Sequence, residues 1–187
     1  MRILAIAGSL RRDSHNRALL RHLAERAPEG VEFEIWDGLK SIPPYDADDD
    51  TDPAPEPVAE LRNAISGADA LFFATPEYNA SIPGVLKNAI DWASRPRDRT
   101  PLQNKPAAVA GATTGRFGAV WSQGELRKVL RHTGARVIDL DLPVPLAHAA
   151  FDEDGALSSA DLDARAQVLL AALVAEVEAS RALSVAA

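Results

Sequence analysis

The sequence predicts an α/β fold, a doubly wound, five-stranded parallel sheet with strand order 2-1-3-4-5. Short apolar runs alternate along the chain with longer stretches in which apolar residues recur with the 3.6-residue period of a helix. The alternation is strict, which is the pattern of repeated βαβ units. The 187 residues match the length of one ordinary domain, so we expect residues 1–187 to fold as a single unit.

Five segments have the length and composition of strands. Residues 3–7 form a continuous apolar run, as expected for a strand buried on both faces of a sheet. Residues 31–36 alternate apolar and charged side chains, which favours a strand nearer an edge. The other three predicted strands are residues 70–74, 106–112 and 135–140.

Five further segments have the apolar stripe of an amphipathic helix. The predicted helices are residues 16–27, 58–65, 82–93, 120–130 and 161–180. The residues at their ends agree with these bounds: Gly30 follows the first helix, Pro83 suits the first turn of the third, and Gly134 follows the fourth. We expect His22 and His132 to lie on solvated helix faces.

Residues 37–57 predict a long surface loop between the second strand and the second helix. The segment contains five prolines and a run of aspartates, and little apolar surface that could pack. We interpret it as an exposed, mobile excursion. It is not a linker, because the elements on either side are too small to be separate domains.

The composition excludes several classes of function. The chain has no cysteines, which excludes thiol nucleophiles, Cys-based zinc sites and disulfides, so any redox chemistry requires a cofactor. The net charge of −7 argues against nucleic acid as a partner. The four histidines share no metal-ligand spacing, so no metal site is predicted. No apolar run approaches the ~20 residues of a membrane span, and the N-terminus lacks signal-peptide features, so we expect a cytoplasmic protein.

In a sheet of this order, ligands bind at the carboxyl ends of the first and third strands. Residues 8–16, which follow the first strand, have the composition of a phosphate site. The start of a helix offers free backbone N–H groups. Ser9, Ser14 and Asn16 add short polar side chains, and Arg11 or Arg12 adds a fixed charge. The loop is neither a Gly-x-Gly-x-x-Gly motif nor a P-loop, which disfavours Rossmann-type dinucleotide binding and Mg-nucleotide hydrolysis. An ordinary capped turn with surface arginines is the alternative interpretation.

Two later loops reach the same edge of the predicted sheet. Residues 75–84 are bracketed by prolines, so their backbone is expected to be stiff enough to face a flat heterocycle, with Tyr78 covering a ring and Asn79 bonding its edge. Residues 111–118 combine glycines, which allow close approach of a ligand, with two threonine hydroxyls. Taken singly, each loop is equally well explained as a surface turn. Their convergence on one edge is what indicates a site.

These loops resemble those of the NAD(P)H-dependent FMN reductase family, flavodoxin-like proteins that include quinone, chromate and azo-dye reductases. The family's first loop is similar to Gly-Ser-Leu-Arg-x-x-Ser-x-Asn, which matches residues 8–16. Its second is similar to Pro-Glu-Tyr-Asn-x-Ser-x-Pro-Gly-x-Leu-Lys-Asn-x-x-Asp-Trp, which matches residues 76–92. A later segment resembles Gly-Arg-x-Gly followed by Gln-x-x-Leu-Arg-x-x-Leu, here residues 115–118 and 123–130. The chain departs from many relatives at Ala119, where they have glycine, and at Trp121 and Gly124.

The resemblance implies that FMN lies across the three loops. The first loop would hold the phosphate, the second would border the ribityl and isoalloxazine groups, and the third would flank the other side of the ring. The implied cofactor-binding residues are Ser9, Arg11, Ser14, Asn16, Pro76, Glu77, Tyr78, Asn79, Thr113, Thr114, Gly115 and Arg116. No side-chain acid or base is required, so no catalytic residue is assigned, with Arg116 the one candidate for stabilising charge on the reduced ring.

The activity implied is hydride transfer from NADPH or NADH to FMN, followed by two-electron reduction of a quinone, free flavin or similar small molecule. A flavodoxin-like electron carrier without its own NAD(P)H activity is the alternative. The resemblance also implies a homodimer or homotetramer with an interface on the helix predicted at residues 82–93. Trp92, on that helix, is either an interface anchor or a core residue of the monomer.

Overall fold

Strands β1 (Arg2–Ala7), β3 (Ala70–Ala74) and β4 (Pro106–Ala112) form the buried centre of a parallel sheet in the computed structural model, which describes residues 1–185. Strand β2 (Glu32–Trp36) pairs with the outer side of β1, and its side chains are less buried than those of the central strands. The strand order is β2-β1-β3-β4-β5, so the predicted order 2-1-3-4-5 is confirmed.

The last predicted strand is divided in two. We expected one strand at residues 135–140, but β5 (Arg136–Val137) and β6 (Pro143–Val144) pair separately with β4, both in parallel. Residues 138–142 lie between them and belong to neither strand, and Asp139 and Asp141 bond Arg131 and Arg127 of the neighbouring helix. The prediction of a continuous strand was wrong because residues 139–141 are all exposed, so the alternation of buried and exposed side chains expected of a strand stops there.

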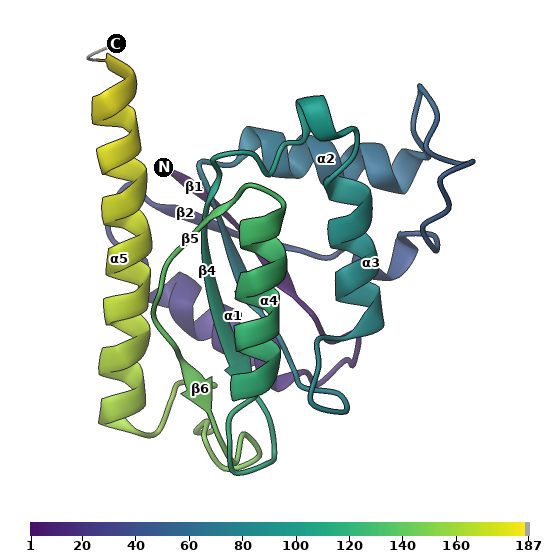
Figure 1. The fold of residues 1–187 in the computed structure, drawn as a ribbon. Coiled ribbons are helices and arrows are strands. Elements are labelled where there is room, and N and C mark those ends of the chain that lie inside the picture. Colours follow the sequence, from purple (N-terminus) through teal and green to yellow (C-terminus); the bar gives the residue numbers. More distant parts are fainter. Residues whose placement is uncertain (186–187) are drawn as a thin grey trace.

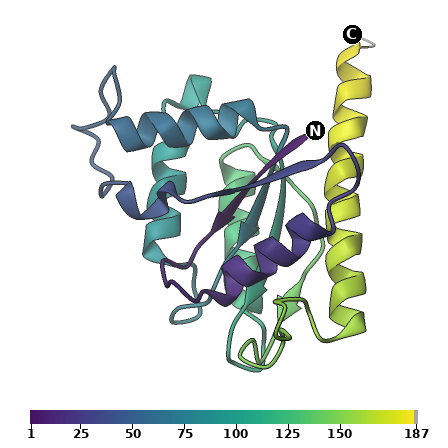
Figure 2. The same cartoon turned by 180° about the vertical axis from the view of Figure 1, so that it is seen from behind.

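Five helices cover the two faces of the sheet (Figure 1). Helices α1 (His15–Glu25) and α5 (Ala160–Val185) lie on one face, as the view from behind shows (Figure 2). Helices α2 (Glu56–Gly67), α3 (Gly84–Ala93) and α4 (Val120–His132) lie on the other. Every predicted helix is present. Helix α3 begins two residues later than expected, because Pro83 is its N-cap and not part of its first turn.

The pleat of each strand divides the core between the two layers. Ile3, Ala5 and Phe72 pack toward α1 and α5, whereas Leu4 and Phe73 pack toward α2, α3 and α4. Alternate side chains of a strand point to opposite faces, so a run that is apolar throughout serves both layers.

Strand β4 is built from small residues, which lets α4 lie close to the sheet. A Cβ atom added to Gly111 would lie 2.8 Å from Cβ of Ala119 and 2.9 Å from the carbonyl oxygen of Thr75. Both distances are shorter than normal carbon contacts, so glycine is required at this position for α4 and the loop after β3 to approach the strand.

The first half of segment 37–57 is packed, contrary to the prediction of an exposed loop. It contains a 3₁₀ helix, η1 (Gly38–Ser41), and the side chains of Leu39 and Ile42 are buried in the core. Tyr45 contacts Trp92 edge to face, with 4.9 Å between ring centroids. The apolar residues of this segment are too few and too widely spaced among prolines to give a helical or strand pattern, which is why the sequence did not reveal them.

Trp92 belongs to the core of the monomer. Its side chain is fully buried, and its indole N–H donates to the carbonyl of Pro43 at 2.9 Å. Of the two roles considered from the sequence, the structure supports the core role and excludes an interface anchor. Any contact between subunits through α3 would therefore use its outward-facing residues.

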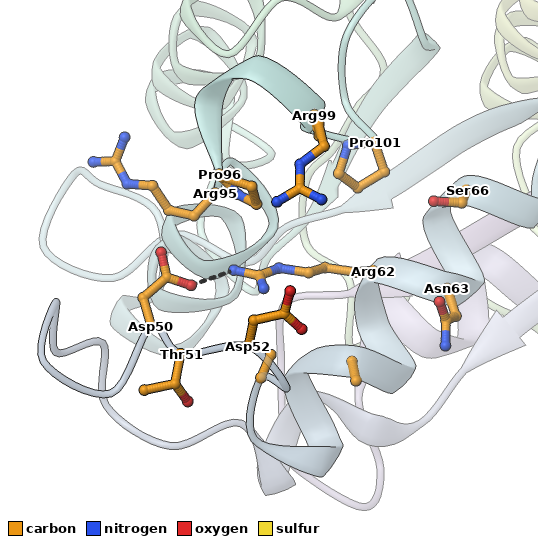
Figure 3. Close-up of a pocket in the computed structure, with 12 residues that line it drawn as sticks. Asp50, Thr51, Asp52, Arg62, Asn63, Ser66, Arg95, Pro96, Arg99 and Pro101 are labelled. Atoms are coloured by element: carbon orange, nitrogen blue, oxygen red, sulfur yellow. Dashed lines mark hydrogen bonds and ion pairs between the residues drawn. The ribbon is translucent and has the colours of Figure 1, made fainter.

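A cavity of about 450 Å³ lies between α2, the loop at residues 50–54 and the segment after α3 (Figure 3). Arg62 spans it, donating to the carboxylate of Asp50 and to the carbonyl of Trp92, both at 2.9 Å. The charged residues that line the cavity are of both signs, three arginines and two aspartates. None of its lining residues comes from the loops that follow β1, β3 and β4, so the cavity is separate from the loops predicted to form the site.

His22 does not lie on a solvated face as predicted. Its side chain is buried, its Nε2 lies 2.7 Å from Oδ1 of Asp163, and its Nδ1 accepts a hydrogen bond from the backbone N–H of Leu157 at 3.1 Å. The two contacts fix one tautomer, in which Nε2 carries the hydrogen. His132, by contrast, is exposed at the end of α4.

Candidate active site

The loops after β1 and β3 meet at the carboxyl edge of the sheet, as strand order predicts. The backbone N–H of Gly8 donates to the carbonyl of Ala74 at 2.8 Å, which joins the ends of β1 and β3. The backbone N–H of Thr75 donates to the carbonyl of Ala110 at 2.9 Å, which joins the loop after β3 to β4. The carboxyl ends of β1, β3 and β4 are therefore joined into one continuous edge, and three loops converge there.

The first loop ends in a capped helix. Ser14 is the N-cap of α1, and its hydroxyl oxygen accepts a hydrogen bond from the backbone N–H of Arg17 at 3.3 Å. The N–H groups of His15 and Asn16, in the first turn, have no carbonyl partner within the helix. They point out of the helix start with the positive end of its dipole, which is the environment that favours an anion.

The side-chain amide of Asn16 forms hydrogen bonds within the protein. Its amide Nδ2 donates to the carbonyl of Ala112 at 2.9 Å, and its Oδ1 accepts from the N–H of the same residue, also at 2.9 Å. The side chain is almost completely buried. It fastens the start of α1 to the end of β4, so a ligand in the first loop would meet the backbone of Asn16 and not its amide.

Ser9, Arg11 and His15 surround the open side of the first loop. The Ser9 hydroxyl accepts from the N–H of Arg11 at 3.4 Å, and the Arg11 guanidinium donates to the carbonyl of Asp13. Arg11 is exposed, with its Nη2 at 3.4 Å from Nε2 of His15. Burial lowers the pKa of His15, and the charges of Arg11 and His148 lower it further, so the site already carries a positive potential that disfavours a second cation.

The second loop is a tight hairpin turn. Tyr78 and Ser81 exchange two backbone hydrogen bonds, of 3.0 and 3.1 Å. Between them Asn79 and Ala80 have φ angles of 54° and 60°, in the left-handed region. Tyr78 is 51% exposed at the tip of this turn, where its ring is free to cover a ligand.

Glu77 fastens the second loop to α4. Its Oε2 accepts hydrogen bonds from the backbone N–H groups of Trp121 and Ser122, both at 3.1 Å. The N-cap residue of α4, Ala119, has no side chain that could do this and adopts a left-handed conformation. Glu77 therefore supplies the missing cap from another loop, and its negative charge lies at the positive end of the helix dipole.

Ser122 and Ser81 add to the same connection. The Ser122 hydroxyl donates to the carbonyl of Pro76 at 2.9 Å, and the Ser81 hydroxyl donates to the Glu125 carboxylate at 2.6 Å. Of the predicted site residues in this loop, Pro76 and Glu77 are engaged by the protein, whereas Tyr78 and Asn79 face solvent. The polar side chains available to a ligand in this loop are thus those of the turn itself.

The third loop contains the predicted residues Thr113, Thr114, Gly115 and Arg116, and Arg116 is exposed. It continues into Phe117, 63% exposed, whose ring contacts that of Trp121 edge to face with 4.9 Å between centroids. The loop thus combines an exposed cation with exposed aromatic surface beside the second loop.

A fourth loop, residues 145–151, reaches the site, and the sequence analysis missed it. The N–H of Leu146 donates to the carbonyl of Gly115 at 3.1 Å, and the N–H of Ala147 donates to that of Thr113 at 2.9 Å. At its end the ring of Phe151 stacks parallel to that of His15, with 6.4 Å between centroids. The signal available was Pro143-Val144-Pro145, which marks a short strand returning to the sheet edge, but we had placed the last strand earlier.

Comparison with known proteins identifies the family. Residues 1–149 match the family described as "NADPH-dependent FMN reductase". The chain belongs to the NADPH-dependent FMN reductase family. The matched residues include the three loops of the site, so the sequence-based assignment to this family is confirmed, and a reductase is supported over an electron carrier without its own NAD(P)H activity.

Relatives within the family are similar over two thirds of the chain or more. An NAD(P)H-dependent FMN reductase of Pseudomonas aeruginosa is 42% identical over 171 residues, which is 91% of this chain and 89% of that protein. A 2-hydroxy-1,4-benzoquinone reductase of a Burkholderia species is 43% identical over 129 residues, 69% of each chain. The solved structure of FerB, a flavoenzyme NAD(P)H:(acceptor) oxidoreductase of Paracoccus denitrificans, has a TM-score of 0.84 and 36% identity and covers 95% of this chain and 97% of its own.

The likeness to FerB confirms the flavodoxin-like fold predicted from the sequence. Among residues 1–185, no helix combines the length and the apolar character needed to cross a bilayer.

Proposed function

We propose that this chain uses bound FMN to take hydride from NADPH or NADH and to reduce quinones by two electrons, with free flavin as a further acceptor. Family membership supports the reductase activity, and the names of the relatives point to quinones as acceptors. The structural observation that carries the proposal is the convergence of four loops at the switch point between β1 and β3, with the start of α1 open to an anion.

The donors of the first loop fit the phosphate of FMN. The N–H groups of His15 and Asn16, the Ser9 hydroxyl and the Arg11 guanidinium all belong to the loop before α1 and its first turn, and Arg11 contacts both Ser9 and His15. The Ser14 hydroxyl accepts from Arg17 and keeps its own hydrogen as a further donor. Charged and dipolar donors together are what a phosphate monoester requires. We therefore propose that Ser9, Arg11, Ser14 and the backbone of Asn16 hold the phosphate.

The remaining loops suit a flat ring system. The second loop, which Glu77 connects to α4, offers backbone groups near Pro76 and Glu77 and the exposed side chains of Tyr78 and Asn79. On the other side, Thr113, Thr114 and Gly115 give hydroxyl groups and an open backbone, since a Cβ atom added to Gly115 would have no neighbour closer than 3.9 Å. We propose that the ring lies between these two loops, with Arg116 close enough to stabilise negative charge.

The chemistry that bound FMN supplies is acceptance of hydride from the reduced nicotinamide and delivery of two electrons to the acceptor. The protein's part is to bind, orient and shield. The hydrogen bonds of Glu77 to Trp121 and Ser122 hold the second loop and α4 in a fixed position relative to each other. The groups that face the ring therefore need no reorganisation during the reaction. Arg116 would favour the reduced state electrostatically, and no side chain is needed as a proton donor.

Further properties belong to the same proposal. We propose that residues 1–187 act as one domain, that the protein works in the cytoplasm, and that it assembles as a homodimer or homotetramer through exposed residues of α3. Light scattering of the purified protein tests the assembly, since a single species of 20.0 kDa would contradict it.

The visible spectrum of the purified protein after FMN is added and excess removed tests the proposed function. Retained yellow colour, bleached anaerobically by NADPH or NADH and restored by a quinone, is the expected result. Arg11→Ala should weaken FMN binding on the order of tenfold, because it removes one charge-assisted donor. Arg97→Ala, at an exposed arginine in η2 (Arg97–Arg99), should leave it unchanged. Failure of the wild type to retain FMN, or colour that no nucleotide bleaches, would contradict the proposal.

A further inference from the structure

A second cavity borders the first loop on its other side. It has a volume of about 370 Å³ and lies between the loop after β1, helix α1 and the segment that follows β2. This volume is within the range of small-molecule sites in proteins. Its lining shares Ser9 and Arg11 with the proposed phosphate site but extends away from β3, toward the outer strand of the sheet. It therefore adjoins the proposed phosphate site, and Arg12, Arg21 and Lys40 belong to the cavity alone.

The cavity is strongly basic in a chain that is acidic. Five cationic side chains and one carboxylate line it, whereas the whole chain has a net charge of −7. The charged residues of the lining are Arg11, Arg12, Arg17, Arg21, Lys40 and Asp37. Such a concentration of one sign around a concave surface raises the local concentration of the opposite charge. The expected occupant is an anion.

Among residues 1–185, three of these cations form no ion pair with a carboxylate, although the charge of Arg21 also acts on Asp37. Arg17 is neutralised by Asp37, to which its Nη2 donates at 2.6 Å. The side chains of Arg12, Arg21 and Lys40 are exposed and form no ion pair with any carboxylate among residues 1–185. The contrast with the cavity of Figure 3 is direct, because there the spanning Arg62 is paired with Asp50. Three unpaired cations around one volume fit a group with more than one negative charge.

The cavity also has an aromatic wall. The half-buried indole of Trp36 lines it. The ring lies against the backbone of Gly38, where only glycine leaves room for it, because a Cβ atom at residue 38 would lie 2.3 Å from Cζ2 of the indole. A flat apolar face beside a group of cations is the combination that binds a base together with its phosphate. Such a lining suits an occupant with an aromatic base as well as a phosphate.

We propose that this cavity binds the adenosine 2′-phosphate of NADPH, with the phosphate on Arg12, Arg21 and Lys40 and the adenine on Trp36. This inference rests on the proposed function, since it places the far end of the nucleotide that reduces FMN. The cavity lies beside β2 and the proposed ring site beside β3, two strand spacings or roughly 10 Å apart, which an extended dinucleotide spans. NADH lacks the 2′-phosphate and gains nothing from the three cations, so the enzyme prefers NADPH.

The test compares Arg21→Ala/Lys40→Ala with a matched control, Arg97→Ala/Lys128→Ala, in the FMN-loaded protein. Both double variants remove one arginine and one lysine from exposed positions, and only the first pair lines the cavity. Calorimetric titration with 2′,5′-ADP measures the site without turnover, and ADP, with the same number of phosphates but none at the 2′ position, is the reference ligand. Steady-state kinetics with NADPH and with NADH, and the dissociation constant of FMN, complete the measurements.

We expect the wild type and the control to bind 2′,5′-ADP more tightly than ADP. The cavity variant should bind 2′,5′-ADP at least on the order of tenfold more weakly and show a similar rise in KM for NADPH, because two charge-assisted contacts are lost. The KM for NADH and the affinity for FMN should stay within about twofold. A parallel loss for both nucleotides, a loss of FMN affinity, or no change would each overturn the proposal.

The outcome is separable from that of the proposed function. A wild type that is reduced equally well by both nucleotides and has no preference for 2′,5′-ADP keeps the reductase activity and overturns the cavity assignment. A wild type that prefers 2′,5′-ADP, with the preference lost in the cavity variant, supports the cavity assignment even where bound FMN is not bleached.

Discussion

The side chain of Asn16 forms two hydrogen bonds of 2.9 Å with the backbone of Ala112, one as donor and one as acceptor. Both partners are almost completely buried. This contact joins the start of α1, where we place the phosphate site, to the end of β4, where the third loop begins. The sequence motif suggested Asn16 as a residue that binds the cofactor. Its side chain connects two of the binding loops and sets the distance between them.

Replacing Asn16 should therefore affect stability as well as binding. Asn16→Ala leaves the N–H and C=O groups of Ala112 buried without partners, and we expect it to lower the free energy of unfolding by about 2–4 kcal/mol. Urea denaturation at equilibrium measures this. Asn63→Ala, at an exposed asparagine of α2, is the control and should change stability by less than about 0.5 kcal/mol. If the two variants were equally stable, the contact would be unimportant for folding.

Removing the carboxylate of Glu77 should loosen the start of α4. Glu77→Ala takes the acceptor away from the N–H groups of Trp121 and Ser122, and we expect a loss of about 1–2 kcal/mol, typical of a lost helix cap. Hydrogen exchange of these two amides should become faster, while the middle of α4 remains protected. Glu60→Ala, at an exposed glutamate of α2, is the matched variant, and equal exchange in both proteins would show that Glu77 is not the cap.

Two glycines of the third loop region should respond differently to alanine. Gly111→Ala forces Ala119 and the carbonyl of Thr75 away from β4, and we expect a destabilisation of about 1–3 kcal/mol. Gly115→Ala places its Cβ in open space, with the nearest atom at 3.9 Å, and should be nearly neutral. The difference between the two melting temperatures is the measurement, and the reverse order would refute the close approach of α4 to the strand.

Stability should depend on pH through His22. Burial lowers the pKa of His22, and the charge of Arg26 adds to this, while Asp163 opposes it. In the unfolded chain the imidazole takes up a proton near its ordinary pKa of 6.5, whereas in the folded protein it does so only at lower pH. Stability from this residue is therefore complete above about pH 6.5, decreases as the pH falls, and levels off below the folded-state pKa.

Comparison of His22→Gln with the wild type isolates this contribution, because the pKa of His15 is also lowered and acts in the same direction. Between pH 7 and pH 5 the melting temperature of the variant should fall less steeply than that of the wild type. His132→Gln, at an exposed histidine of α4, is the control for loss of an imidazole. Parallel curves for the wild type and His22→Gln would show that His22 does not contribute to the pH dependence.

The central strands and the helices were predictable because their apolar patterns are long and regular. Strand β3 and strand β4 have the bounds expected from residues 70–74 and 106–112. The division of the last strand was not predicted, since the apolar residues of 135–140 resemble those of a continuous strand and do not reveal that residues 139–141 are all exposed.

The burial of polar residues was also not predicted from the apolar pattern of the sequence. His22 lies three residues after Leu19 and next to Leu23, so it falls within the apolar stripe of α1, and spacing alone could have placed it in the core. The contacts that satisfy it come from Leu157 and Asp163, more than 100 residues later, and these could not be inferred. The same holds for Glu77, whose partners are backbone groups of another element.

The Glu77 contact also bears on how such enzymes can be altered. The donors to Glu77 are backbone N–H groups, which every helix start has, so the contact does not depend on the side chains of α4. A second loop taken from a relative with the same Pro-Glu-Tyr-Asn motif should therefore still cap α4 in this chain. Exchange of acceptor preference by transfer of residues 78–81 should then succeed as long as the glutamate at position 77 is kept.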